Sequence, residues 1–428
     1  MSIPDCLFLS HPQSRNSGDY LHRVAWPGDA LASHMSVGGI QTTHPQALSL
    51  AMQAPLLIIM MIIDPVIERL IKARKRRGMS TVYEISDDFA DFPASLPLHD
   101  FYSRAENQQM VYRLAGLCDA VQFSSEALAE KYQHCNPVIH VFRNQLPDKS
   151  YRLKNRTHSG PLVIGWSGSS GHLEDARFLA ETLSGWSGLR QLSIAVMASD
   201  NIIQCFKQAG IRVKRYATGS MQAYLKFLRK LDVGVAVLGK SDFNQGRSDG
   251  KFLEYASQGV IALCSAHGPY LSTIKDGVNG FLFEDAEQLR AKLTCIVKDA
   301  SMRQRIRQVA MDEVATTRTH AIASTDRADF YRQWLNVEQG CADYQEFEHA
   351  DEADLLGALE LHAAGQLEAA FEVYLQLLDR QNEFYLLWQR ASELCSQTGL
   401  AQDAALFADK ASTLLDDVLA VTPGVMEE

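Results

Sequence analysis

The feature that most constrains the fold is a strand–helix–strand unit in the first quarter of the chain. An uninterrupted apolar run, 56–63, predicts a strand that is covered on both faces. Asp64 and Pro65 follow as the expected N-cap and first residue of a helix, which Gly78 is expected to end. A second strand is predicted at 81–85. Strands joined through a helix run parallel, so the unit predicts a parallel sheet covered by helices.

The same alternation continues along most of the chain. Further strands are expected at 6–9, 120–123, 138–142, 162–166, 194–197, 233–238, 260–264 and 280–283, with helices at 126–132 and 174–183. A polar stretch, 149–159, divides the series, so we expect one α/β domain at 1–155 and another at 156–340. Two such domains predict a ligand cleft between them, at the carboxyl ends of both sheets.

Helices replace strands in the last part of the chain, which predicts an all-α tail at 345–428. Gly365 and Gly399 are 34 residues apart, and Ala370 and Ala404 keep the same offset. This period resembles the tetratricopeptide repeat, in which small residues let two helices pack closely. A plain helical hairpin is the alternative.

The tail also carries more apolar side chains than two repeats can bury, at Tyr385, Leu386, Leu387 and Trp388. We therefore expect it to contact the α/β body, a second subunit or a partner protein. The sequence favours a contact with another protein, and the pattern of the tail is separate from that of the α/β domains.

Composition excludes several classes of protein. The net charge is −10, with 41 basic against 51 acidic residues, which argues against a nucleic-acid partner. The longest apolar run, 54–63, is too short to span a bilayer, and residues 1–5 lack a secretory signal. The 8 cysteines form no CxxC pair, so neither a disulfide framework nor a zinc site is expected. We expect a cytoplasmic protein with reduced cysteines.

The densest polar stretch, 242–260, lies between two predicted strands. Its glycine-containing loop opens a predicted helix at 249–257, and the N-terminus of a helix binds phosphate through free N–H groups. Arg247 and Lys251 add positive charge beside that position. Glu254, about one turn further on, can accept two hydrogen bonds from a ribose. A capped helix with solvated charges is the alternative.

This stretch resembles the C-terminal domain of the GT-B glycosyltransferases of the retaining "group 1" type. The resemblance places Glu254 on the ribose of a nucleotide sugar, and 248–251 against its diphosphate. It extends over roughly 1–335 and is strongest over 232–283, where Ile261 stands in place of a proline. The other segments that carry it are 118–125, 141–144, 162–172, 256–262, 267–270 and 276–282.

The resemblance implies two Rossmann-like domains facing a cleft, and a hexosyltransferase reaction that retains configuration and requires no metal or cofactor. The donor substrate would be a nucleoside diphosphate sugar, and the acceptor a protein, a glycan or a lipid-linked molecule. The implied donor-binding residues are Gly168, Ser169, His172, Asn244, Ser248, Asp249, Gly250, Glu254, Gly268 and Tyr270. The implied catalytic residues are Arg247, Lys251 and Asp88. Asp88 is included because the pair Asp87-Asp88 follows a predicted strand, at the position where an acceptor-facing acid would lie. The alternative is that this pair caps a turn.

The sequence departs from the family pattern in two ways. The common pattern has two glutamates eight positions apart, and Gly246 stands where the first would be. One branch of the family has Asn, a basic residue, Ser and Lys before a single Glu, which this chain fits. The histidine often found near the sugar has no evident counterpart. A non-catalytic adaptor that binds a protein through its helical repeats is therefore the alternative function.

Two other motifs allow different interpretations. Gly165, Gly168 and Gly171 resemble a dinucleotide-binding loop, although the spacing differs and Asp200 lies 29 residues beyond Gly171. The basic run 72–77 ends a predicted helix, where cations favour the helix dipole. The same run would suit peripheral contact with an anionic membrane. An oligomer is compatible with the sequence.

Overall fold

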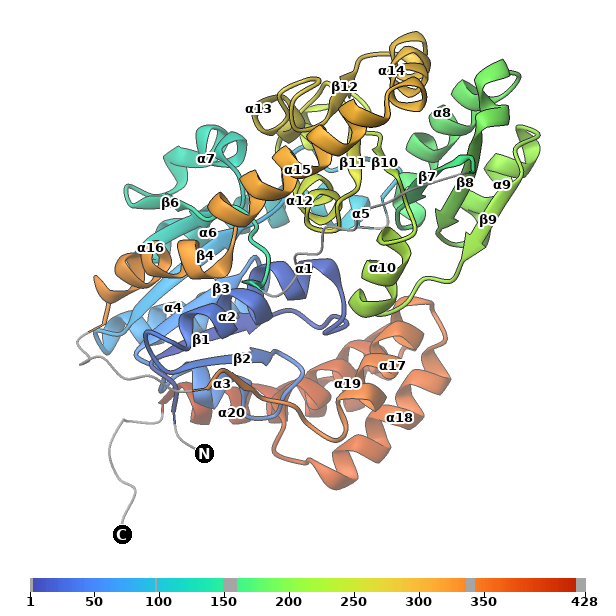
Figure 1. Cartoon of the computed structure of the whole chain (residues 1–428). Helices are drawn as coiled ribbons and strands as arrows, with labels where there is room; N and C mark the ends of the chain where they lie inside the picture. The colour runs from blue at the N-terminus through green and yellow to red at the C-terminus, as the bar shows by residue number, and fades with distance from the viewer. Residues whose placement is uncertain (1–2, 97, 149–159, 336–342, 421–428) are drawn as a thin grey trace.

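The computed structural model describes residues 3–96, 98–148, 160–335 and 343–420, and contains two parallel sheets followed by a bundle of helices (Figure 1). This confirms the predicted α/β architecture with an all-α tail. The predicted linker, 149–159, lies outside the described residues.

The first sheet has seven strands in the order β13-β2-β1-β3-β4-β5-β6, and every pair is parallel. The strands are β1 (Cys6–Ser10), β2 (Val37–Gln41), β3 (Leu56–Met60), β4 (Ser80–Ile85), β5 (Ala120–Phe123), β6 (Ile139–Val141) and β13 (Gln345–Glu346). In β1, Cys6 and Phe8 belong to the core on one face, and Leu7 and Leu9 to the core on the other. Both faces are covered, which explains why the central strands are apolar throughout.

Helices cover both faces of this sheet. They are α1 (Gly18–Tyr20), α2 (Trp26–Leu31), α3 (Ala47–Ala51), α4 (Pro65–Arg76), α5 (His99–Tyr102), α6 (Ala105–Leu117), α7 (Glu126–Tyr132) and, from much later in the chain, α16 (His320–Arg332). A π-helical turn, Leu21–Ala25, joins α1 to α2. The predicted start of α4 is confirmed, because the Asp64 carboxylate accepts a hydrogen bond from Val66 N at 2.8 Å.

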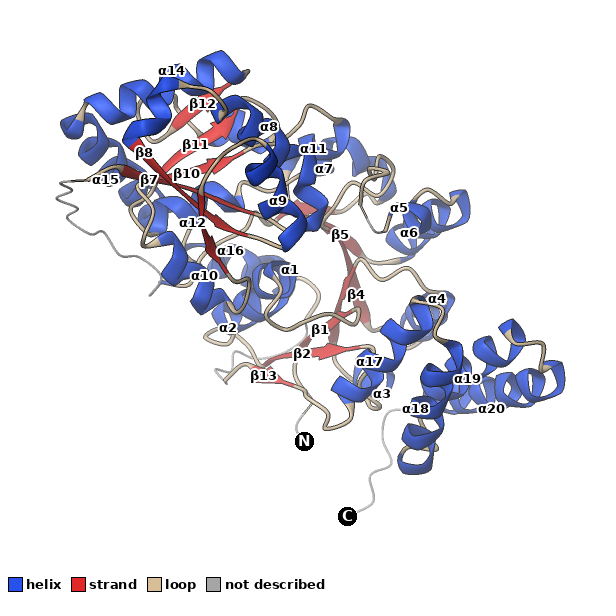
Figure 2. Cartoon of the chain, turned by 90° about the vertical axis from the view of Figure 1, so that its right-hand side faces the viewer, coloured by secondary structure: helices blue, strands red, loops and turns tan. Residues whose placement is uncertain are grey.

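The second sheet has six strands in the order β12-β11-β10-β7-β8-β9, again all parallel. Its strands are β7 (Leu162–Ser167), β8 (Leu192–Met197), β9 (Val213–Tyr216), β10 (Val233–Ala236), β11 (Ile261–Ser265) and β12 (Phe281–Phe283). Its helices are α8 (Leu173–Leu183), α9 (Asp200–Gln208), α10 (Met221–Leu228), α11 (Asp242–Gln245), α12 (Gly250–Ser257), α13 (Pro269–Thr273), α14 (Ala286–Lys298) and α15 (Ala300–Thr317). Figure 2 shows the strands of the two sheets as separate groups.

The chain returns to the first sheet after the second is complete. Helix α16 lies beside the first unit (Figure 1), and its Tyr331 hydroxyl donates to Gln122 Oε1 of β5 at 2.7 Å. Strand β13 then pairs with β2. A side chain at Gly39 of β2 would collide with Tyr344, just before β13, so the glycine is needed for this close approach. The glycines of β2 also explain why the sequence did not predict this strand.

The tail consists of two helical hairpins, α17 (Glu352–Ala363) with α18 (Leu367–Arg380) and α19 (Tyr385–Gln397) with α20 (Ala401–Ala420). Gly365 and Gly399 follow α17 and α19 with φ of 74° and 82°, a conformation that suits glycine at a helix end. The assignment to tetratricopeptide repeats stays a prediction.

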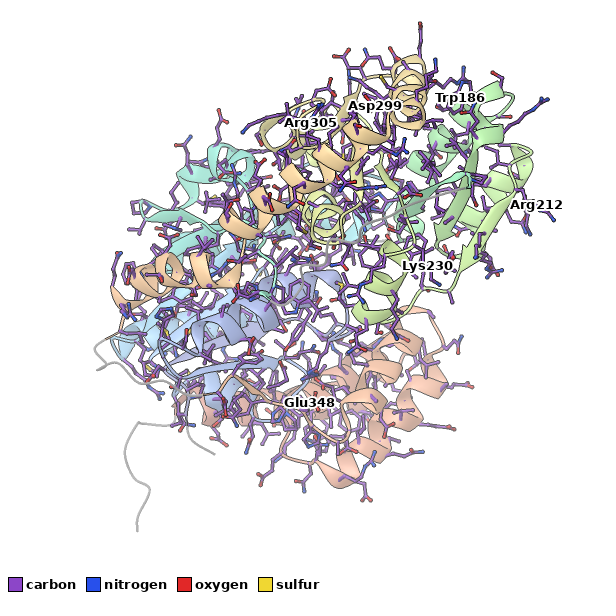
Figure 3. All side chains as sticks on the ribbon, viewed as in Figure 1. Trp186, Arg212, Lys230, Asp299, Arg305 and Glu348 are labelled. Atoms are coloured by element: carbon purple, nitrogen blue, oxygen red, sulfur yellow. The ribbon has the colours of Figure 1, made fainter. Side chains whose placement is uncertain are left out.

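The tail packs on the first unit, which is one of the three contacts expected for its apolar side chains, and the favoured contact with another protein stays a prediction. Leu415 of α20 is 5% exposed and belongs to the core of the first sheet, beside α3 and α4. Arg15 of the first unit pairs with Glu352 at 2.6 Å and with Glu348 at 3.7 Å, at the junction marked by Glu348 in Figure 3. Leu386 and Leu387 are buried within the tail, and Tyr385 packs against the first unit.

The basic run at the end of α4 is partly structural. Arg74 is fully buried and donates to the Ala54 carbonyl at 2.9 Å, and Arg77 donates to the Leu419 carbonyl of the tail. Lys72, Lys75 and Arg76 are exposed, so membrane contact through them stays a prediction. None of the helices in the described ranges combines the length and apolar composition that a bilayer-spanning segment requires.

Docking of the tail can be tested with two leucines of α20. Leu415 is 5% exposed and Leu406 is 65% exposed. Leu415→Ala should lower the free energy of unfolding by about 2–5 kcal/mol, because it leaves a cavity between α20 and the first unit. Leu406→Ala, the matched control, should change it by less than about 0.5 kcal/mol. Denaturant unfolding measures both, and equal effects would show that α20 does not dock as described.

Candidate functional site

A cavity of about 490 Å³ opens between the two α/β units. It lies beyond the carboxyl ends of β7 and β10, the neighbours between which the strand order of the second sheet reverses. Such a reversal is where open parallel sheets bind ligands. Segments that follow β1 and β4 of the first sheet face it, so both units contribute to one cavity as the sequence predicted.

The cavity gathers most of the predicted site residues. Those that line it are Gly168, Ser169, His172, Arg247, Ser248, Gly250, Lys251, Glu254 and Tyr270. Four predicted residues do not line it, namely Asp88, Asn244, Asp249 and Gly268. Residues of the same lining that the prediction omitted are Ser17, Gly18, Asp19, His22, Asp87, Asn144, Trp166, Ser167 and 235–238.

Glu254 is the centre of a polar network in this cavity. Its Oε2 accepts from the Tyr224 hydroxyl at 2.7 Å and from Lys251 Nζ at 3.4 Å, and Lys251 Nζ also donates to the Tyr224 hydroxyl at 2.8 Å. Its Oε1 lies 3.6 Å from Nε2 of His22, which comes from the first unit. Burial raises the pKa of Glu254, but Lys251, His22 and Tyr224 outweigh burial and lower the pKa to about 2. The carboxylate is therefore ionised at neutral pH and presents an acceptor to the cavity.

A buried ion pair fixes the start of α12. Both Asp249 carboxylate oxygens accept from Arg318, at 2.7 and 2.8 Å, and Arg318 also donates to the Asn144 carbonyl of the first unit at 2.8 Å. Burial opposes ionisation of Asp249, but Arg318 and Thr273 lower its pKa below the usual value. Asp249 therefore holds the helix N-terminus in place, while its neighbours Ser248 and Gly250 face the cavity. Asp249 itself does not line the cavity, and its predicted contact with the donor stays a prediction.

Of the adjacent pair Asp87 and Asp88, Asp87 lines the cavity and the predicted Asp88 does not. Asp88 is 2% exposed, and its carboxylate accepts from Lys131 Nζ at 2.6 Å and from the Tyr132 hydroxyl. It therefore stabilises the loop after β4. Asp87 lies 3.4 Å from Arg247 across the cavity, and burial raises its pKa to about 6 although Arg247 opposes this effect.

Close approaches explain three glycines around the site. A Cβ at Gly168 would lie 2.6 Å from the Trp166 ring, so the turn after β7 passes directly over the indole. A Cβ at Gly246 would lie 2.8 Å from Leu128 of the first unit. A glutamate at 246 therefore has no room in this arrangement of the units. Gly268, with φ of 55°, packs against the Asn244 backbone, so these two residues support the loop outside the cavity.

His172 and the glycines of the suggested dinucleotide-binding loop are held by contacts with neighbouring side chains. His172 Nδ1 lies 2.8 Å from Asp175, at the start of α8. Of the other two glycines in the suggested dinucleotide loop, Gly165 packs on Leu231 and Gly171 on Leu96 of the first unit. Within the described ranges, no group of three or more His, Cys, Asp or Glu side chains is arranged to hold a metal ion.

The omitted residues come equally from the two units, and those of the first unit are the less expected. His22 lies on the π-helical turn and is 6% exposed, and neither ring nitrogen has a hydrogen-bond partner among the described residues. Such turns are frequent at functional sites. Asn144 donates from Nδ2 to Ser248 Oγ at 3.1 Å, which links the two units beside the cavity. The signal that could have found Gly18 and Asp19 is their place after β1, where the order of the first sheet reverses.

Comparison with known structures identifies the fold as GT-B. The chain is similar to HepE of Anabaena, solved with UDP and glucose, at 12% identity and a TM-score of 0.58, over 77% of this chain and 99% of HepE. It is also similar to sucrose-phosphate synthase of Thermosynechococcus elongatus, at 11% identity and a TM-score of 0.57, over 77% of this chain and 98% of that one. A glycosyltransferase of Rickettsia africae matches at 12% identity and a TM-score of 0.56, over 78% and 99% of the two chains.

At these identities, the likeness establishes the architecture of two facing Rossmann-like domains. No protein-family profile matches the sequence, and no curated protein matches it significantly.

The role of the buried ion pair can be tested by changing Asp249. Asp249→Asn removes the carboxylate that accepts two hydrogen bonds from the largely buried Arg318, so the free energy of unfolding should fall by about 1–3 kcal/mol. The control is Asp329→Asn, which removes an ion pair between Asp329 and Arg332 with exposed fractions of 63% and 33%. That change should cost less than about 1 kcal/mol. Denaturant unfolding measures both variants. An equally small decrease in the free energy of unfolding in the two would refute the structural role of Asp249.

Proposed function

We propose that this protein is a glycosyltransferase that moves a sugar from a nucleoside diphosphate sugar to an acceptor hydroxyl. The observation that carries the proposal is the meeting of Arg247, Lys251 and Glu254 with the N-terminus of α12 in one cavity. These groups suit a diphosphate and a ribose, and the facing Asp87 suits a hydroxyl. HepE, which shares the fold, has been solved with UDP and with UDP-glucose, so a UDP-sugar is the first donor to test.

In this proposal, the second unit binds the donor. Ionised Glu254 accepts hydrogen bonds from the ribose hydroxyls, and Lys251, Arg247 and the amides at the start of α12 face the diphosphate. When the bond between the sugar C1 and the diphosphate oxygen breaks, negative charge grows on the departing diphosphate. Fixed positive groups then stabilise the transition state more than the ground state. We propose that these cations make a metal ion and a cofactor unnecessary.

The first unit is proposed to bind the acceptor. The acceptor oxygen forms the new bond to C1 on the face from which the diphosphate leaves with the electron pair of the broken bond, so the configuration is retained. Asp87 accepts the proton of the acceptor hydroxyl in this step. The resemblance of 242–260 to the "group 1" enzymes supports retention of configuration and transfer of a hexose. The acceptor hydroxyl belongs to a protein, a glycan or a lipid-linked molecule.

A non-catalytic adaptor is the second candidate, and the observation that favours it is Gly246 in place of a glutamate. The closed packing of Gly246 on Leu128 would suit a scaffold that has lost turnover. Release of nucleoside diphosphate separates the two candidates. An enzyme hydrolyses its donor slowly even without an acceptor, whereas an adaptor releases nothing from any UDP-, GDP- or dTDP-sugar.

The donor assignment predicts the effect of Glu254→Gln. A charge-assisted hydrogen bond contributes about 1.5–3 kcal/mol, so the variant should bind the nucleotide and its sugar about 10- to 100-fold more weakly. Calorimetry measures the affinity, after a thermal-shift panel of UDP, GDP and dTDP has selected the base. Glu287→Gln, an exposed residue of α14, is the matched control and should leave affinity unchanged. Unchanged affinity in Glu254→Gln would remove this residue from the donor site.

The pKa of Asp87 predicts the pH dependence of transfer. With a pKa of about 6, Asp87 is protonated below that pH and cannot accept the acceptor proton. The kcat/KM for the acceptor should therefore rise about tenfold per pH unit below pH 6 and level off above it. Asp87→Asn should lower the plateau about 100-fold or more and remove the rise. Nucleotide affinity measured over the same range separates binding from proton transfer, and an unchanged profile in Asp87→Asn contradicts the assignment.

A further inference from the structure

Two smaller cavities continue from the candidate site toward the helical tail. The first has a volume of about 90 Å³ and shares Asp19 and Asp87 with the candidate site. The second, of about 270 Å³, shares His11, Met61 and Leu98 with the first. Successive cavities therefore have common walls along the carboxyl edge of the first sheet. We call the second one the tail cavity.

The tail cavity is closed on one side by the tail itself. Leu359 of α17 and Leu386 of α19 face Met61, Ile62 and Ile67 of the first unit across it. Most of its lining is apolar, with aliphatic and aromatic side chains. At its rim, Leu98 and Phe101 are 55% and 38% exposed, so apolar surface extends from the cavity to the solvent.

The two charged groups of this cavity have partners within the protein, although Nε of Arg390 is buried without a hydrogen-bond partner among the described residues. The Asp64 carboxylate caps α4 through Val66 N at 2.8 Å, and Arg390 Nη1 pairs with Glu393 at 2.6 Å. Neither charge requires a charged ligand. The chemistry left for a ligand is that of an apolar chain, because its burial removes apolar surface from water on both sides.

We propose that the tail cavity binds the alkyl chain of an amphipathic acceptor, whose hydroxyl lies beside Asp87. The proposal rests on the proposed glycosyltransferase function and names its acceptor class. The shared lining residues support the proposal. When the polar end of a molecule lies at Asp87, its chain can extend through the 90 Å³ cavity into the tail cavity. The tail then acts as one wall of the acceptor site, which explains why it docks on the first unit.

Calorimetry with alkyl glucosides of increasing chain length, from methyl to dodecyl and below their micelle concentrations, tests the proposal without a donor. Affinity should increase by about fourfold for each methylene that enters the cavity. It should level off when the chain exceeds the length of the cavity, whereas nonspecific adsorption would continue to increase. Equal affinity for methyl and octyl glucoside overturns the proposal.

The double variant Leu98→Ser/Phe101→Ser changes exposed residues and therefore preserves the fold. It should weaken octyl glucoside binding about tenfold or more and leave methyl glucoside binding unchanged. Leu406→Ser, 65% exposed on α20 and outside the cavity, is the matched control. Equal losses in both variants overturn the proposal. The proposal is also overturned if sedimentation shows that the unmodified protein is a dimer and the double variant a monomer. The apolar rim would then be a subunit interface.

Donor hydrolysis, measured beside the alkyl glucoside series, separates this proposal from the function on which it rests. If octyl glucoside binds as expected but no nucleotide sugar is hydrolysed, the cavity assignment stands and the glycosyltransferase function fails. If donors are hydrolysed and the alkyl series shows no increase in affinity, the function stands and this acceptor class is wrong.

Discussion

The buried ion pair between Asp249 and Arg318 is the interaction on which the geometry of the cleft depends. One guanidinium joins the start of α12, the end of α15 and, through the Asn144 carbonyl, the end of the first unit. Burying two charges is favourable only when their hydrogen bonds are satisfied, and here both carboxylate oxygens are used. Glu254 and Lys251 lie on the helix fixed in this way, so their positions relative to the first unit follow from this contact.

The parallel strands at the centre of each sheet could be predicted, because burial on both faces leaves an apolar run in the sequence. Three of the described strands could not be predicted from the sequence. β2 contains Gly38 and Gly39, which make room for Phe347 and Tyr344, and so lacks the side chains that mark a strand. β9 is an edge strand with exposed Lys214 and Arg215, and β13 has only two residues. Each of these three strands forms because of contacts with residues that are distant in the sequence, and a local sequence pattern does not indicate such contacts.

The candidate site shows the same division. A helix N-terminus with its basic residues and a glycine-containing turn are local patterns, so Gly168, Lys251 and Glu254 could be found from sequence. His22 and Asn144 reach the cavity from separate parts of the first unit, and no spacing marks them. Asp87 and Asp88 are adjacent and chemically identical, and only the position of Lys131 and Tyr132 decides which of them faces the cavity.

The return of the chain to the first sheet has a consequence for biosynthesis. Cys6, Phe8 and Val37 lie in a core that α16 completes with Ala328 and Tyr331, and β2 stays an open edge until β13 arrives. At a synthesis rate of about 5–20 residues per second, roughly 10–40 s separate the end of β6 from the emergence of α16. During that interval the ribosome-bound first unit presents an apolar sheet face and an unpaired strand edge. The N-terminal half of the chain therefore reaches its native packing only after the C-terminal half exists.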